Sequence, residues 1–306
     1  MTGVLIGFAI IAFIIAVGYM VGRLGILGSQ AGFVLNRVVF FVLSPCLLFT
    51  VLESARASDL FSSLLVVSLI AAVVCFSLYA LIAQLAWRPQ APELVIGSMS
   101  AGYVNANNIG IPVAVYVLGS VAYSAPVVLL QLVLFTPIVL TLLDVLTTGR
   151  ASLGRILLKL ASNPLIIGSV LGVLLAVTGI HLPQPVLQPF VLLGGAAVPV
   201  VLLAFGMSLH GQKILAAGNG RREILLASAI KLVVMPVVAW GVGHFVFGVA
   251  GHPLFVVVAL AALPAAQNVF NYAQRYGRGE IVARDIVLIT TIGSIPVLVV
   301  VAALLG

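Results

Sequence analysis

Long apolar runs recur along the whole chain, and short polar linkers separate them. Each run is close to the roughly 20 residues that an α-helix needs to cross the hydrocarbon core of a bilayer. The pattern predicts ten transmembrane helices, at residues 3–22, 33–52, 62–86, 94–118, 125–147, 157–178, 187–208, 224–247, 254–274 and 284–305. We therefore expect an all-α polytopic membrane protein that is surrounded by the lipid bilayer.

The fourth predicted span contains a polar stretch, NANNIGIP, that an uninterrupted helix facing lipid would not tolerate. In hydrocarbon a broken helix survives only where it is buried in protein or lines a cavity. Gly110 allows close approach of the backbone, and Pro112 can begin a second half-helix whose positive end points into the membrane. These two residues and the three amides Asn105, Asn107 and Asn108 are therefore candidates for a substrate-binding site.

The ninth predicted span has a matching interruption, in the sequence ALPAAQNVFNYAQRYG. Pro264 removes a helical hydrogen bond and disfavours helical geometry at the residue before it. Gln267, Asn268 and Asn271 follow on a polar helical stripe. Such amides commonly form hydrogen bonds between packed membrane helices, so helix packing is one interpretation and a binding site is the other. Two amide-rich, proline-broken spans at corresponding positions favour the binding site.

An internal repeat makes these positions correspond. Prolines recur at matching places in the two halves of the chain, Pro45 with Pro199 and Pro137 with Pro296. The match predicts two repeats of five spans, residues 1–149 and 150–306. Because five is odd, the two repeats must have opposite topologies in the membrane. Inverted repeats with interrupted helices are a recurrent plan of secondary transporters.

One basic residue, Lys231, is expected inside the eighth span. It follows Arg222 by nine positions, which places it roughly 13 Å deep at about 1.5 Å per residue. A cation at the bilayer centre costs about 2.5 to 3.5 kcal/mol on insertion scales and tends to face a partner or a wet cavity. Two roles are open for Lys231: it supplies positive charge to a substrate, or it pins the two broken spans structurally.

The seven acidic residues are all expected near the ends of spans, at Glu53, Asp59, Glu93, Asp144, Glu223, Glu280 and Asp285. A sodium–proton antiporter would need a carboxylate where the broken helices meet, and the pattern predicts none there. A membrane centre that holds Lys231, amides and half-helix N-termini suits an organic anion instead.

The basic residues predict the orientation of the chain. Ten spans place both termini on one side of the membrane. With the N-terminus outside, cytoplasmic loops hold twelve of the fourteen basic residues, namely Arg23, Arg37, Arg88, Arg150, Arg155, Lys159, Lys213, Arg221, Arg222, Arg275, Arg278 and Arg284, and Arg56 falls outside. The positive-inside rule therefore predicts a protein of the cytoplasmic membrane with both termini on the non-cytoplasmic side. These loops account for the net charge of +7, so nucleic-acid binding is not expected.

Five sequence stretches resemble the auxin efflux carrier family, and specifically its short prokaryotic members: NANNIGIPVAVYVLG, ASNPLIIGSVLG, GGAAVPVVLLAFGMSL, KLVVMPVV and LPAAQNVFNYAQRYG. The resemblance implies ten helices in two inverted repeats, with broken helices 4 and 9 crossing beside the substrate. It also implies a scaffold and homodimer face from helices 1, 2, 6 and 7, and a transport domain from helices 3–5 and 8–10. The plant carriers' long loop after helix 5 is replaced here by the short stretch TTGRASLGRI, and auxin recognition does not carry over.

The leading hypothesis is a secondary active or facilitative transporter of small organic anions, mono- or dicarboxylates, that works by elevator-type alternating access. The alternative is a sodium-coupled organic anion symporter of the bile-acid-symporter type, and coupling to protons is also open. We expect no enzyme activity, because the chain offers no catalytic set, metal site or cofactor motif at membrane depth. A sensory or purely structural role is a further alternative, because a transporter fold does not prove flux.

Overall fold

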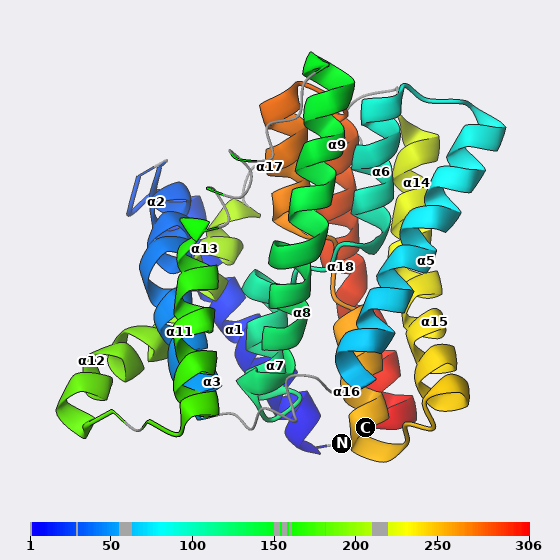
Figure 1. The fold of residues 1–306 in the computed structure, drawn as a ribbon. Coiled ribbons are helices and arrows are strands. Elements are labelled where there is room, and N and C mark those ends of the chain that lie inside the picture. The colour runs from blue at the N-terminus through cyan, green and yellow to red at the C-terminus, as the bar shows by residue number, and fades with distance from the viewer. Residues whose placement is uncertain are drawn as a thin grey trace. The chain divides into compact units, whose positions relative to one another are not determined.

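The structure is a computed structural model that describes residues 2–28, 30–54, 63–149, 154, 158, 161–180, 182–209 and 220–306. These residues are almost entirely helical (Figure 1). Six helices are long and apolar enough to cross a membrane: Ala31–Glu53, Ser63–Ala86, Val121–Thr147, Gln184–Ser208, Arg221–Val246 and Glu280–Leu305. The expectation of a helical membrane-spanning chain is confirmed at this level. The expectations for Arg56, Asp59, Arg150, Arg155, Lys159 and Lys213 concern residues outside the described part.

The chain divides into two compact units, each built from segments that are distant in sequence. Unit 1 comprises Met1–Ser62, Asn107–Leu129 and Leu158–Gln212. Unit 2 comprises Ser63–Ala106, Leu130–Leu157 and Lys213–Gly306. Each unit therefore takes residues from both halves of the sequence.

Unit 1 contains α1 (Thr2–Leu24), α2 (Ala31–Val38), α3 (Ser44–Glu53), α7 (Ile111–Tyr116), the 3-10 turn Val121–Tyr123, α8 (Ala125–Leu130, whose last residue belongs to unit 2), α11 (Pro164–Thr178), α12 (Gln184–Gly195) and α13 (Ala197–Ser208). Helix α1 packs on α13, and α3 packs on α11 and α12. Glycines make this possible, because a Cβ atom on Gly168 or Gly172 of α11 would collide with the backbone of α3. Small residues at such contacts are typical of helix packing in membranes.

Helix α11 begins later than the predicted start of the sixth span at residue 157. The Asn163 side chain accepts a hydrogen bond from the Leu165 N–H at 2.9 Å, and Pro164 occupies the first turn. An asparagine cap followed by proline is a strong helix start, which explains why α11 begins at Pro164.

Unit 2 contains α5 (Ser63–Ala86), α6 (Ala91–Gly102), α9 (Thr136–Thr148), α14 (Arg221–Ala229), α15 (Met235–Gly241), α16 (Gly251–Ala261), α17 (Gln267–Tyr276) and α18 (Glu280–Leu305). Helix α6 packs against α5, α9 and α14, and α18 packs against α14, α16 and α17 (Figure 1). Residues Leu254 to Ala261 of α16 are all buried. A helix that is buried on every side forms the centre of its domain, so α16 is the core of unit 2.

Four π-helical turns are each followed by an α-helix whose second residue is proline. Val39–Leu43 precedes Pro45, Ala106–Gly110 precedes Pro112, Gln131–Phe135 precedes Pro137, and Ile230–Val234 precedes Pro236. Proline lacks an N–H and its ring clashes with the carbonyl four residues earlier, and a wider π turn relieves both problems. The chain is therefore helical through each of these prolines. The α-helix expected to begin near Pro112 is α7, which begins at Ile111, but the π turn that precedes it makes the chain helical already from Ala106.

Candidate functional site

Two interrupted helices of unit 2 pair with each other through short extended segments. Helix α6 ends at Gly102 and α16 ends at Ala261, and the next helical residues are Ala106 and Gln267. Between them, Val104 and Ala265 form an isolated antiparallel bridge. We call residues 103–106 and 262–266 the paired segments. Both predicted spans are thus interrupted, but the first break lies at residues 103–105 and not at Gly110 or Pro112.

The paired segments satisfy one another's backbone polar groups. The Asn105 N–H donates to the Pro264 carbonyl at 2.8 Å, and the Ala266 N–H donates to the Tyr103 carbonyl at 2.9 Å. The Ala265 N–H donates to Oγ1 of Thr290 in α18, at 3.1 Å. Each of these contacts replaces a helical hydrogen bond that the break removed, which is the condition for irregular backbone at membrane depth.

The N-terminus of α17 leaves backbone donors free. No side chain caps this helix, and within the described residues neither the Gln267 nor the Asn268 N–H has an acceptor. Both side chains are half-buried, whereas Asn271, one turn later, is exposed. Unpaired N–H groups and the positive end of the helix dipole together favour an anion at this place.

Hydroxyl groups from three elements meet beside the paired segments. The Tyr103 hydroxyl lies 3.0 Å from Oγ1 of Thr136 in α9, and the same Oγ1 lies 3.5 Å from the Tyr272 hydroxyl of α17. The Asn268 side chain also lies close to the Tyr103 hydroxyl. Tyr103 is buried. Sequence reasoning missed these hydroxyls, and the available signal was the spacing of four residues between Asn268, Tyr272 and Tyr276, which places them on one face of α17.

Lys231 is fully buried, and its ammonium contacts the end of α16. Its Nζ donates to the carbonyl of Ala261, the last residue of α16, at 2.7 Å. This carbonyl end carries the negative part of the helix dipole, so the contact is favourable. This hydrogen bond is a contact of the kind that a structural role requires, and the choice between the two roles of Lys231 stays a prediction. No carboxylate of the described residues pairs with this ammonium, and Ala261 is its sole hydrogen-bond acceptor among them.

The predicted site residues fall into two groups. Asn105, Lys231, Pro264, Gln267, Asn268 and Asn271 belong to unit 2, whereas Asn107, Asn108, Gly110 and Pro112 belong to unit 1. In unit 1 the Asn107 Nδ2 donates to Asn108 Oδ1 at 2.8 Å, and Asn107 Oδ1 is buried without a partner among the described residues. Gly110 has an ordinary helical φ of −65°, so the backbone there does not require glycine. The union of both groups in one site stays a prediction.

Comparison with known protein families shows to which family the chain belongs. A family described as Membrane transport protein matches residues 4–302. The chain belongs to this membrane transport protein family. Its members include the auxin efflux carriers that the sequence motifs resemble, so that expectation is confirmed.

Three relatives show the range of this membrane transport protein family. An "Uncharacterized transporter" of Methanothermobacter thermautotrophicus is 28% identical over 263 residues, which cover 83% of the chain and 82% of the relative. A "Putative malonate transporter" of Rhizobium meliloti is 28% identical over 293 residues, which cover 92% and 89%. A "Probable auxin efflux carrier component 5b" of Oryza sativa subsp. japonica is 31% identical over 154 residues, or 49% of the chain and 41% of the rice protein. The two prokaryotic relatives thus match along most of their length.

Proposed function

We propose that this membrane transport protein carries small organic anions, mono- or dicarboxylates, as a secondary active or facilitative transporter. The observation that carries the proposal is the uncapped N-terminus of α17, where the N–H groups of Gln267 and Asn268 have no acceptor in the described part of the chain. A carboxylate oxygen supplies the acceptor that these donors lack. In this respect the proposed site resembles the half-helix N-termini that bind anionic substrate groups in other transporters.

The buried Lys231 also supports the proposal that the substrate is an anion. Its ammonium has one carbonyl acceptor and no carboxylate partner among the described residues. An unbalanced buried cation is costly, and an anionic substrate nearby would offset that cost. The relative from Rhizobium, whose printed name refers to malonate, supports the choice of carboxylates.

The proposed mechanism is elevator-type alternating access. In it, unit 2 carries the substrate, and unit 1 supplies the scaffold and the homodimer face. Segment Asn107–Leu129, which the family resemblance assigns to the moving domain, is grouped with unit 1. Ten transmembrane helices in two inverted repeats, residues 1–149 and 150–306, complete the proposed architecture. We place the protein in the cytoplasmic membrane with both termini on the non-cytoplasmic side, because the basic loops favour that orientation.

Binding and uptake by the purified full-length protein test this proposal. We expect malonate, malate or lactate to raise the melting temperature, since a ligand that binds only the folded state stabilises it. Asn268→Ala keeps the backbone N–H but removes the amide side chain beside it, and it should weaken the affinity for that anion about tenfold, which corresponds to one charge-assisted hydrogen bond from that side chain. Asn108→Ala and Asn271→Ala test the rest of the predicted site. Full anion affinity in all three variants would reject this site, and absence of uptake of every carboxylate into proteoliposomes would reject the function.

The same uptake assay separates the coupling alternatives. The Lys231 ammonium already occupies the Ala261 carbonyl, which is the kind of helix end that coordinates sodium in other transporters. This contact favours transport without sodium. We therefore expect uptake to continue when choline replaces sodium, and loss of uptake under that exchange would establish the sodium symporter instead. Repeating the assay at two pH values tests coupling to protons.

A further inference from the structure

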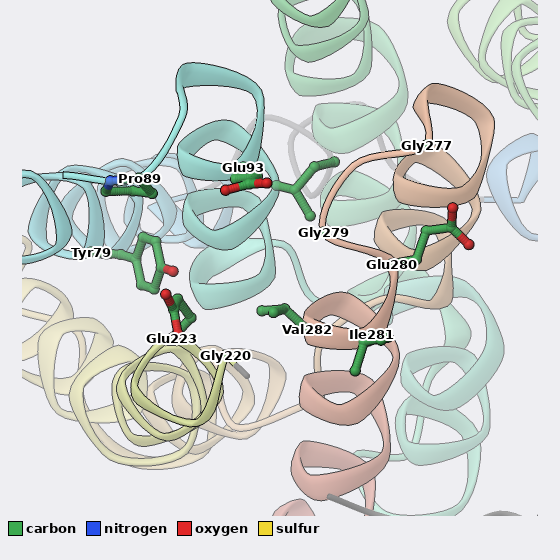
Figure 2. Close-up of a pocket in the computed structure, with 11 residues that line it drawn as sticks. Tyr79, Pro89, Glu93, Gly220, Glu223, Gly277, Gly279, Glu280, Ile281 and Val282 are labelled. Carbon is green, nitrogen blue, oxygen red and sulfur yellow. The ribbon is translucent and has the colours of Figure 1, made fainter. Parts of the chain in front are cut away.

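A hollow of about 610 Å³ lies in unit 2, away from the paired segments. It is found where α6, α14 and α18 begin and beside the last turns of α5 (Figure 2). Ile96, Ile281 and Val282 form its apolar wall. Its volume falls within the range of roughly 300 to 1,000 Å³ that is typical of small-molecule sites.

Three glutamates line this hollow, and each lies in the first turn of a different helix. Figure 2 shows that the Glu280 carboxylate is directed away from the other two. Glu93 is in α6, Glu223 is in α14 and Glu280 is in α18. A first-turn glutamate complements the dipole of its own helix, which explains each residue taken singly. Within the described residues, however, none of the three forms an ion pair or a hydrogen bond. Like charges at one hollow repel one another, and a cation placed between Glu93 and Glu223 would relieve the repulsion.

Tyr79 gives an independent sign of a ligand. Its side chain is only 1% exposed, yet its hydroxyl has no hydrogen-bond partner among the described residues. The ring is held against α6, because a Cβ atom on Gly97 would overlap its atoms. Figure 2 shows the hydroxyl directed into the hollow on the side of Glu223. The hydroxyl oxygen is not one of the fully buried unpaired atoms of the described residues, so it reaches the open space of the hollow, where a bound molecule would supply a partner.

The lining selects the chemistry of that molecule. The carboxylates disfavour an anion. The described residues contain no group of three or more His, Cys, Asp or Glu side chains arranged to hold a metal ion. Carboxylate and hydroxyl oxygens accept hydrogen bonds from N–H donors, and the apolar wall suits methylene groups. We propose that this hollow binds a small organic cation that carries ammonium or guanidinium groups, at a site separate from the proposed anion site.

Calorimetric titration of the purified full-length protein tests this site. The probes are butane-1,4-diamine and agmatine, with tetramethylammonium as a cation that has no N–H donor. We expect saturable binding of at least one N–H probe, and binding of tetramethylammonium at least tenfold weaker. Glu223→Gln should weaken binding of the N–H probe tenfold or more, because it removes a negative charge, and Tyr79→Phe a few-fold, because it removes one acceptor. The matched control Glu53→Gln changes a carboxylate of α3 in unit 1 and should bind as the wild type does.

Several results would overturn the proposal. They are no saturable binding of either N–H probe to the wild type, equal affinity in Glu223→Gln and wild type, or equal loss in Glu53→Gln and Glu223→Gln. Glu223→Asp separates charge from folding, because it keeps the carboxylate and should retain most of the binding. If the aspartate variant keeps the wild-type melting temperature but binds as weakly as the glutamine variant, the charge is not responsible and the site is rejected. Malonate binding in these variants reports separately on the anion site.

Discussion

The N-terminus of α17 beside the paired segments and the carboxylate-lined hollow both involve helix N-termini of unit 2, but the charges that they offer a ligand are opposite. Helices α6, α14 and α18 each carry a glutamate in the first turn, whereas α17 has no acidic residue there. A first-turn carboxylate offsets the positive end of its own helix, and its absence leaves that end free for another negative group. A helix N-terminus therefore indicates the charge of a bound ligand only when the side-chain charges of its first turn are considered with it.

The largest effect is expected from Lys231→Met, which removes the buried positive charge near the paired segments. We expect anion affinity to fall by a factor that corresponds to about 2 to 5 kcal/mol, the cost of removing one partner of a buried charged contact. Binding measured on purified protein checks this, with exposed Arg222→Met as the control. Wild-type anion affinity in Lys231→Met would show that this lysine does not contribute to the difference in charge between the paired segments and the hollow.

Asn268→Asp would make α17 resemble the other three helices. The new first-turn carboxylate should stabilise the helix by about 0.3 to 1 kcal/mol. It should also weaken anion binding at least about tenfold through repulsion of like charges. Melting temperature and anion affinity, measured on the same sample, should therefore move in opposite directions. Gln274→Glu, on the exposed part of α17 and outside the predicted site, is the control and should change both much less.

Thr290→Val tests whether the hydrogen bond from the paired segments to α18 stabilises them. The substitution leaves the buried Ala265 N–H without its acceptor, which should cost about 1 to 3 kcal/mol. The neighbouring Thr291 offers a matched control, because its Oγ1 is buried without a partner among the described residues. Thr291→Val should be neutral or stabilising in thermal unfolding. Equal loss of stability in both variants would mean that the Ala265 contact does not matter.

Tyr276→Phe should have the smallest effect. The Tyr276 hydroxyl donates to Oδ1 of Asp144 at 2.6 Å and joins α17 to α9. Its loss should lower the free energy of unfolding by about 0.5 to 1.5 kcal/mol. Anion affinity should not change, because this contact lies two turns beyond the N-terminus of α17. A clear drop in affinity would extend the substrate site along α17.

Local patterns in the sequence predicted much of this fold and part of the candidate site. Apolar length located the six helices of the described residues that are long enough to span a membrane. Pro264 marked the second break, and the isolated charge of Lys231 marked a buried contact. The first break was misplaced, because the sequence shows Pro112 but not the π turn that accommodates it. The hydroxyls of Tyr103, Thr136 and Thr290 were missed, since their roles arise from contacts between distant segments that no local pattern contains.

The bridge between Val104 and Ala265 also constrains how this stretch can change in length. Successive residues of extended backbone face opposite ways, so Tyr103 and Asn105 share one side and Val104 takes the other. Inserting or deleting a single residue here would turn the tyrosine and the amide outward and bring apolar groups into their place. Connecting loops elsewhere can lengthen at little thermodynamic cost. Natural variants and engineered insertions should therefore accumulate in those loops and spare these few residues.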